Sequence, residues 1–353
     1  MATKATRTTA NQPSSQRKYR SRAAYSEIRR RHNFSAPESP RYSSLNAGED
    51  SSDRHAAKLG FVSQKHANVP RMLDQKHIRR RFERAADSFD GADFVHAATR
   101  EGLLSRLELL LVDAKTVVDL GAATGTSSRP LERRFKGARV VSVDIAAAML
   151  KKGRNKKAWL AKTGFAQANA EQLPFADASV DVVFSNMLLP WIDDPALMFT
   201  EIARVLQKGG LFAFATLGPD SLQEMNRAWA AVDGGAHVNR FLDMHNLGDG
   251  LVNAGLRDPV LDVDRLAVNY GDCDSLFRDL TAVGGRNTSR QRTSGLTGKQ
   301  RFEGMRAALD ASAIDGRITL DLELVFGHCW GGGPKMDPSN YRIDAKQIPI
   351  RRS

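Results

Sequence analysis

Two acids and a loop of small residues are the part of the sequence with the clearest chemistry. Asp119 lies in the apolar run "TVVDL" (116–120), and the loop Gly121-Ala122-Ala123-Thr124-Gly125 follows at once. A dinucleotide site needs the spacing Gly-x-Gly-x-x-Gly, which this loop lacks, and here an acid precedes the first glycine. A carboxylate at that strand end would repel a pyrophosphate but attract a cationic group. The spacing therefore predicts a site for a positively charged ligand.

A second acid supports this interpretation. Asp144 ends the next strand-like run, where a carboxylate can accept both hydroxyls of a ribose. Asn169 and Ala170 follow the third run, where an adenine ring would lie, and Asn186 ends the fourth, nearest the reacting end of the ligand. S-adenosylmethionine (SAM) carries an ammonium and a sulfonium but no phosphate. We therefore expect SAM as the cofactor.

The elements that must position these residues alternate between apolar strands and amphipathic helices, which is typical of a parallel, doubly wound sheet. Strands are predicted at 116–120, 138–145, 164–170, 180–188, 209–217, 258–270 and 319–330. Helices are predicted near 76–89 and 94–110, then at 127–135, 146–156, 195–206, 274–285 and over most of 221–256. The carboxyl ends of the parallel strands would bring the two acids together.

Composition limits the class of protein. The 353 residues are 41% hydrophobic and contain no apolar run of about 18 residues, so no membrane partner is expected. The net charge is +12, but residues 1–70 hold 13 basic and 5 acidic residues, so the body is only mildly basic and no nucleic-acid partner is expected from its charge. Cys273 and Cys329 show no CxxC spacing, which favours a reducing compartment such as the cytoplasm.

The two ends of the chain differ from the body. Residues 1–75 are predicted to be a disordered basic tail, 76–330 the folded domain and 331–353 a polar tail. The basic tail is open to several interpretations: a solvated tail, a transit peptide that would make the protein mitochondrial, a nucleic-acid-binding arm, or a segment before a translation start at Met72.

The motifs together resemble class I SAM-dependent methyltransferases. The resemblance rests on D-x-G-x-x-x-G from Asp119, the acid after the second strand, A-E-x-L-P-F at 170–175 and R-V-L-x-x-G-G at 204–210. It implies a Rossmann-like, doubly wound, mostly parallel seven-stranded sheet with N-terminal cap helices. It also adds four residues to the cofactor site: Gly121, Ala123, Gly125 and Ile145. This sequence departs from the family at Ala123, where glycine is usual, and at Asn169, where aspartate is frequent.

Longer segments narrow the resemblance. The segments "RRRFERAADSFDGADFVHAATREGLL" (79–104), "GPDSLQEMNRAW" (218–229) and "HVNRFLDMH" (237–245) are similar to the malonyl-[acyl-carrier protein] O-methyltransferases of biotin synthesis. The similarity runs from about 76 to 330. It implies methyl esterification of the free carboxylate of a malonyl thioester, with malonyl-loaded acyl carrier protein or malonyl-CoA as partner. Such a carboxylate is ionised at pH 7 and needs no general base.

Four residues are candidates for the acceptor site. Arg240 is the first choice to hold the malonyl carboxylate, with His237 as a polar neighbour, although a surface ion pair would also explain Arg240. Phe89 and Trp191 could form an apolar lid, or could simply be core aromatics. His237 and His245 have no third ligand beside them, so no metal site is expected.

A run of basic residues, Arg286, Arg290, Arg292, Lys299 and Arg301, is a candidate surface for an acidic carrier protein, or else a solvated loop. Three further functions stay open. The fold could act on another small carboxylate, or as an arginine hydroxylase of respiratory complex I assembly, which the chain resembles around "VNYGDCDSLFRDL". An RNA-associated binding protein is the non-enzymatic alternative, supported only by the basic tail.

Overall fold

The computed structural model describes residues 73–156, 161–290 and 298–333, which all belong to one unit of the chain, residues 71–353. The predictions for the two tails, apart from their inner ends, and for Arg292 lie outside the described residues. In these described ranges no helix is long and apolar enough to cross a membrane.

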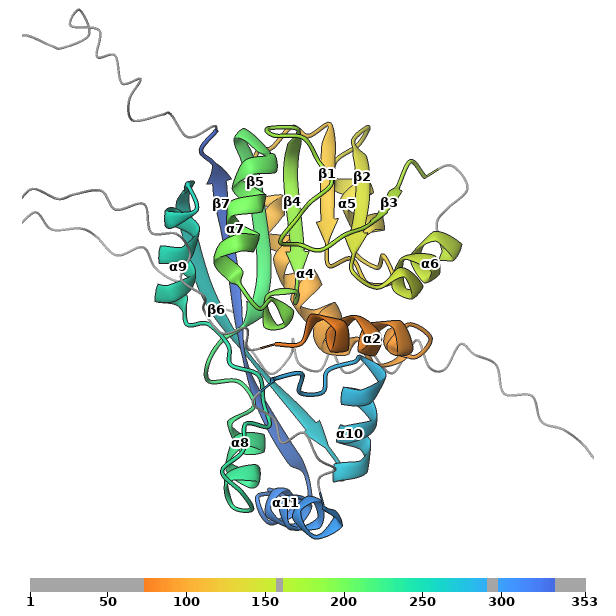
Figure 1. Cartoon of the computed structure of the whole chain (residues 1–353), viewed down its shortest axis with the longest axis vertical. Coiled ribbons are helices and arrows are strands. Elements are labelled where there is room, and N and C mark those ends of the chain that lie inside the picture. Colours follow the sequence, from red (N-terminus) through yellow and green to blue (C-terminus); the bar gives the residue numbers. More distant parts are fainter. Residues whose placement is uncertain (1–72, 157–160, 291–297, 334–353) are drawn as a thin grey trace, which may run out of the picture. The chain divides into compact units, whose positions relative to one another are not determined.

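A seven-stranded sheet with the order β3-β2-β1-β4-β5-β7-β6 forms the centre of the fold (Figure 1). Strands β1 to β5 pair in parallel, whereas β7 runs antiparallel between β5 and β6. The strands are β1 (Thr116–Leu120), β2 (Arg139–Asp144), β3 (Gly164–Gln167), β4 (Val180–Asn186), β5 (Leu206–Leu217), β6 (Leu256–Tyr270) and β7 (Ile318–Gly331). The predicted doubly wound, mostly parallel seven-stranded sheet is confirmed.

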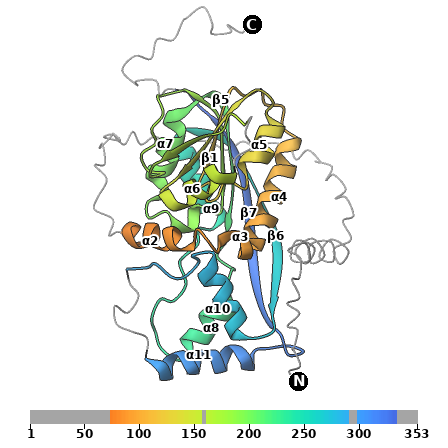
Figure 2. The same ribbon diagram turned by 90° about the vertical axis from the view of Figure 1, so that its right-hand side faces the viewer.

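Helices cover both faces of the sheet, with α4 and α5 on one face and α7 and α9 on the other (Figure 2). These helices are α4 (Phe94–Glu108), α5 (Ser128–Arg134), α6 (Ala147–Lys156), α7 (Pro195–Val205) and α9 (Met244–Asn253). Successive residues of a strand point to opposite faces, so Val117 belongs to one hydrophobic core with Leu107 of α4, while Val118 belongs to another with Ile202 of α7. The strands are therefore buried on both sides, as their continuous apolar runs predicted.

The long strands β6 and β7 extend past the ends of the parallel strands and carry a second group of helices at their far end (Figure 1). These are α8 (Gln223–Ala230), α10 (Cys273–Ala282) and α11 (Lys299–Ala311). They share a hydrophobic core of their own, to which Trp229, Leu276, Met305 and Leu320 belong. This smaller core lies beyond the carboxyl ends of the parallel strands, where ligands bind in such folds.

Two N-terminal helices, α2 (Gln75–Ala85) and the short α3 (Phe89–Ala92), lie between the sheet and the helices at the far end (Figures 1 and 2). Asp74 caps α2 by accepting a hydrogen bond from the backbone N–H of His77, 3.1 Å away. Ala85, Ala86 and Phe89 pack against Ala146 and Met149 of the sheet domain. These helices therefore cover the strand ends.

Apart from the break of the helix predicted near 76–89 into α2 and α3, the structure differs from the sequence-based expectation in two places. Residues 231–243, expected to be mostly helical, form a connection without regular secondary structure between α8 and α9, because Gly234 and Gly235 break the helix after Asp233. Helix α11 was not predicted, although Met305 and Leu309 lie one turn apart on its buried face. Both differences fall in the region that forms the second core.

Candidate active site

The loop after β1 takes a tight, left-handed path. Gly121, Ala123 and Gly125 have φ angles of +73°, +46° and +73°. Glycine adopts such angles freely, whereas alanine is strained there. The N–H groups of Gly121 and Ala122 donate to the carbonyl oxygen of Val143, over 2.8 and 3.0 Å. The loop is thereby fixed against the end of β2, beside Asp144.

Asp144 joins the two loops that follow β1 and β2. Its Oδ2 accepts the N–H of Ala123 at 2.9 Å, and its Oδ1 accepts the N–H of Ala146 at 2.8 Å. Burial raises the pKa of the Asp144 carboxyl to about 6, although both backbone hydrogen bonds lower it. Each oxygen keeps a further lone pair, so the carboxylate can still accept hydrogen bonds from a diol.

Asp119 lies deeper than its strand-end position in the sequence indicated. Its side chain is buried and accepts a hydrogen bond from Ser128 Oγ at 2.8 Å, and Ser128 Oγ lies 2.7 Å from Ser142 Oγ. Burial raises the pKa of Asp119 to about 7, opposed by the Ser128 hydrogen bond and the charge of Arg100. Asp119 lines neither cavity described below, and its hydrogen-bond partner Ser128 is the first residue of α5.

A small cavity of about 70 Å³ lies against this loop. Its lining brings together nine of the predicted site residues, namely Phe89, Gly121, Ala123, Asp144, Ile145, Asn169, Ala170, Asn186 and Trp191. Gly125 and Asp119 are absent from that lining. Asn186 donates through Nδ2 to the carbonyl oxygen of His96 at 2.9 Å, but its buried Oδ1 has no partner in the described part of the chain. An unpaired buried acceptor of this kind fits a donor on a ligand.

Helix α2 closes one side of the small cavity with Gln75, Ile78 and Phe82. Gln75 Nε2 donates to both carboxylate oxygens of Glu171, at 3.0 and 2.9 Å. Glu83 accepts the N–H groups of the first two residues of α6, Ala147 and Ala148, at 2.8 and 2.9 Å. A carboxylate at a helix N-terminus is stabilising, so these contacts hold α2 over the loop.

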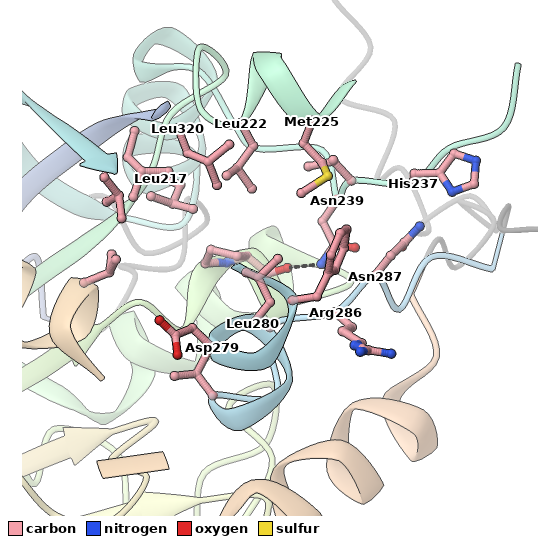
Figure 3. A pocket seen from close by; sticks show the side chains of 18 of the residues that line it. Leu217, Leu222, Met225, His237, Asn239, Asp279, Leu280, Arg286, Asn287 and Leu320 are labelled. Atoms are coloured by element: carbon pink, nitrogen blue, oxygen red, sulfur yellow. Dashed lines mark hydrogen bonds between the residues drawn. The ribbon is translucent and has the colours of Figure 1, made fainter. Parts of the chain in front are cut away.

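A larger cavity of about 790 Å³ lies between α2, α4 and the second core (Figure 3). Most of its wall is apolar and comes from segments far apart in the sequence, such as Leu217, Leu222, Met225, Leu280 and Leu320. The cationic groups in its lining are Arg81, Arg286 and Lys299, and Figure 3 shows Arg286 and His237 on the same side of the cavity. The volume lies within the range of about 300 to 1,000 Å³ that small-molecule pockets span.

His96, Met187 and Trp191 line both cavities, so the two spaces meet at these residues. His96 was not predicted as a site residue. Its signal in the sequence is helical spacing, because it lies seven and eleven residues before the buried Leu103 and Leu107, on the inner face of α4. A histidine in phase with buried leucines therefore marks a polar group directed into the fold.

The structure places the predicted acceptor residues differently from one another. His237 lines the large cavity, with Nε2 2.7 Å from Asp233 Oδ1 and its ring stacked on Trp229 at 3.7 Å between centroids. Arg240, in the connection between α8 and α9, is exposed and lines neither cavity. Phe89 and Trp191 line the small cavity, and Trp191 also lines the large one.

The residues of the basic run also differ in whether they line the large cavity. Arg286 and Lys299 line the large cavity, whereas Arg290 donates through Nε to the carbonyl oxygen of Leu73 at 3.1 Å and so holds the segment before α2. The guanidinium Nη1 of Arg301 lies 3.9 Å from Oδ2 of Asp233. No group of three His, Cys, Asp or Glu side chains suited to a metal ion occurs among the residues that the structure describes.

Comparison of the sequence with known proteins agrees with a methyltransferase fold. Residues 118–214, which run from β1 into β5, match the family model "Methyltransferase domain". The chain is 37% identical over 283 residues to the malonyl-[acyl-carrier protein] O-methyltransferase of Laribacter hongkongensis, covering 78% of this chain and 95% of that protein. It is 36% identical to the enzyme of the same name from Gallionella capsiferriformans, covering 79% and 99%, and 38% identical to that from Methylovorus sp., covering 73% and 90%.

Proposed function

The chain belongs to the family of the malonyl-[acyl-carrier protein] O-methyltransferases, and from this premise we propose that it methylates the free carboxylate of a malonyl thioester. SAM supplies an electrophilic methyl group on its sulfonium. In the proposed reaction the S–CH₃ bond breaks, a C–O bond forms at the carboxylate, and adenosylhomocysteine leaves. No proton moves, because the acceptor carboxyl group is already ionised at pH 7.

The residues of the small cavity fit this cofactor. Asp144 faces the cavity with acceptor capacity for the two ribose hydroxyls, and the unpaired Oδ1 of Asn186 can accept from the ammonium group. Asn169 and Ala170 would border the adenine, and Ile145 would pack on it. The buried charge of Asp119 favours the cation from a distance. Gly121 and Ala123 would present backbone to the ligand, with Gly125 keeping the turn behind them.

The small cavity needs to widen when SAM enters. Its volume of about 70 Å³ is well below the 300 Å³ at which pockets for such ligands begin. Helix α2 supplies three of the lining residues and is held to the domain by side-chain contacts at Gln75 and Glu83. We expect α2 to move outward to admit the nucleoside and then to close over it, which would exclude water from the methyl group.

The large cavity would hold the acceptor. Its apolar wall suits the aliphatic arm of a thioester, and Arg81, Arg286 and Lys299 suit its anionic groups. His237, held by Asp233, is the polar neighbour that we propose for the same end of the cavity. Arg240 is exposed, so we propose that it meets the acidic surface of a carrier protein at the rim, where it steers association. The cytoplasm, or the mitochondrion if the N-terminus is a transit peptide, remains the expected compartment.

One observation carries the proposal: two cavities of different character meet at His96, Met187 and Trp191. A carboxylate entering from the large cavity would approach a methyl group held in the small one at this point. Most of the acceleration that such a site needs comes from alignment and the exclusion of water. This agrees with a lining in which apolar side chains predominate around a few polar groups.

The test is methyl transfer from tritium-labelled SAM to malonyl-loaded carrier protein, with the acetyl-loaded carrier protein as a matched control that lacks the free carboxylate. We expect label in the malonyl thioester only. Malonyl-CoA and free malonate, assayed in parallel, show whether the carrier protein is required. Label in free malonate alone, or in none of the acceptors, would overturn the proposal.

A further inference from the structure

His96 occupies a position that no other histidine in the described residues shares. It is the third residue of α4 and one of the three residues that line both cavities. Of the other two, Met187 has only a thioether and Trp191 only an indole N–H, and the Trp191 ring packs edge-on against Phe82 at 5.2 Å. His96 is therefore the group best placed to contact an acceptor at the junction.

The imidazole is held by packing, while its nitrogen atoms are unpaired. The ring lies edge-on to Phe89 with 5.0 Å between centroids, and the backbone carbonyl of His96 accepts the Asn186 Nδ2 hydrogen bond. Nδ1 is buried without a hydrogen-bond partner in the described part of the chain, and Nε2 has no hydrogen bond there either. Of the two ring nitrogens, Nδ1 is inaccessible, whereas Nε2 is unpaired without being inaccessible. Nε2 is therefore the nitrogen that reaches the cavity surface.

The charge and the tautomer of His96 follow from its surroundings. Burial, with the nearby charge of Arg100, lowers the pKa of His96 to about 4, so the ring is neutral at pH 7 and carries one N–H. A proton on Nδ1 would leave a buried donor without an acceptor, which is costly. A proton on Nε2 points into the open space and can find an acceptor on a ligand.

We propose that the Nε2–H group of His96 donates a hydrogen bond to one carboxylate oxygen of the acceptor and holds the other oxygen in line with the methyl group. This inference rests on the proposed function and names a catalytic residue for it. A neutral donor suits the task better than a cation. It does not repel the positive sulfonium nearby, and it does not neutralise the carboxylate that must attack.

The test compares His96→Phe with His96→Gln in the methyl-transfer assay. Phenylalanine keeps an aromatic ring against Phe89 but removes the donor, so kcat should fall about 100-fold, as for the loss of one aligned donor elsewhere. Glutamine restores an N–H at a similar distance and should recover about tenfold of that loss. Affinity for adenosylhomocysteine, measured by calorimetry, should stay within about twofold in both variants and also reports that they fold.

His245→Phe makes the same exchange at an exposed histidine that lines neither cavity, so it is the matched control and should keep kcat within about twofold. A His96→Phe variant with wild-type kcat, or one that loses adenosylhomocysteine affinity in parallel with kcat, overturns the inference and leaves the proposed function intact. Wild-type protein that transfers no methyl group to any malonyl thioester overturns the proposed function, and the inference with it.

Discussion

The cavities on the two sides of His96 are built in different ways. The small one is lined by residues at the ends of four neighbouring strands, β1 to β4, with α2 as its cover. The large one collects residues from α4, α8, α10, α11 and the far parts of β6 and β7. The difference shows that the fold provides the first site directly through its topology, whereas the second depends on additions to that fold.

The electrostatics of the two regions also differ. Of the two acids of this region, the half-buried Asp144 lines the small cavity and Asp119 is fully buried, and burial raises the pKa of both. The large cavity has three cationic residues, Arg81, Arg286 and Lys299, in its lining. Each region thus carries charge of the sign opposite to that of the ligand that we propose for it. Substitutions that change one region should leave binding to the other nearly unaltered.

Substitution of Asp144 by alanine should have the largest effect on the cofactor side. It removes the acceptor for the ribose and also the anchor of the Ala123 and Ala146 N–H groups. With two buried donors left unpaired, we expect adenosylhomocysteine to bind at least about 100-fold more weakly by calorimetry. The Michaelis constant for the malonyl acceptor should change little.

Asp181→Ala is the matched control for this variant. Asp181 also accepts two backbone N–H groups, from Lys115 and Thr116, but it lies at the start of β4, away from both cavities. It should lower the melting temperature without weakening adenosylhomocysteine binding. Equal losses of affinity in both variants would mean that Asp144 acts only by stabilising the fold.

Charge reversal at Arg286 tests the acceptor side. Arg286→Glu should raise the Michaelis constant for the malonyl-loaded carrier protein about tenfold, because it reverses a charge in the cavity lining. Arg240→Glu changes a residue that is equally basic and exposed, like Arg286, but that lies outside the lining. It should have a smaller effect that disappears at high salt. SAM affinity should be the same in both variants.

A larger rise in the Michaelis constant for Arg240→Glu than for Arg286→Glu would mean that the acceptor carboxylate binds near Arg240, as predicted from the sequence. Arg290 is a poorer choice for this test. Its Nε hydrogen bond to Leu73 holds the segment before α2, so its substitution would disturb the cofactor region as well.

The sequence predicted the cofactor region better than the acceptor region, because strand ends line the first cavity whereas added helices line the second. On the cofactor side Asp144, Gly121 and Asn186 each end a strand or follow one, and parallel pairing brings strand ends together without knowledge of side-chain packing. Asp119 shows the limit of that reasoning. Its place in the strand was correct, but only the structure reveals that its carboxyl group accepts a hydrogen bond from Ser128 and lines neither cavity.

The acceptor region could be predicted only in part. His237 and Trp191 line the large cavity, whereas Arg240, three residues beyond His237, faces solvent, because the connection 231–243 has no regular periodicity from which to read a direction. Arg286 follows α10 and Lys299 begins α11, and they line the same cavity only because these two helices pack together. Such long-range arrangements leave no local spacing in the sequence.

The acidic cofactor region should also respond to pH. Ionisation of Asp144 and Asp119 is complete only above their pKa values of about 6 and about 7, so affinity for SAM should rise about tenfold between pH 5.5 and 8. Raised carboxyl pKa values have the opposite effect on the ligand-free fold. Their contribution to stability is complete below about pH 4, the value in the unfolded chain, and is lost as the pH rises through 6 and 7.

Calorimetry and thermal unfolding across this pH range check both slopes. Asp119→Asn should flatten the upper part of the affinity profile, between pH 6.5 and 8. An affinity that does not change with pH in the wild-type protein would show that neither acid titrates before the cofactor binds.

A smaller effect is expected at the helix that covers the small cavity. Glu83→Ala removes the carboxylate that binds the first two N–H groups of α6, and loss of a helix cap costs about 1 kcal/mol. If the closed position of α2 loses this free energy, adenosylhomocysteine should bind about fivefold more weakly, because about 1.4 kcal/mol corresponds to a factor of ten. Arg79→Ala, one turn earlier on α2 and in an exposed ion pair with Glu83, is the control and should have no measurable effect.

The smallest effect is expected from replacing Ala123 by glycine, in the loop that separates the two acids. Ala123 has a φ of +46°, a conformation that costs an L-residue about 1 to 2 kcal/mol. Glycine removes that strain but gains freedom in the unfolded chain, which costs about 0.5 to 1 kcal/mol, so the net gain is small. We expect adenosylhomocysteine to bind up to about threefold more tightly by calorimetry, with the Ala123 N–H bond to Asp144 retained. Ala122→Gly, at the buried neighbouring alanine without a positive φ, should instead lower stability. Weaker binding in Ala123→Gly would show that the methyl group contributes contacts at the cofactor site that outweigh the strain.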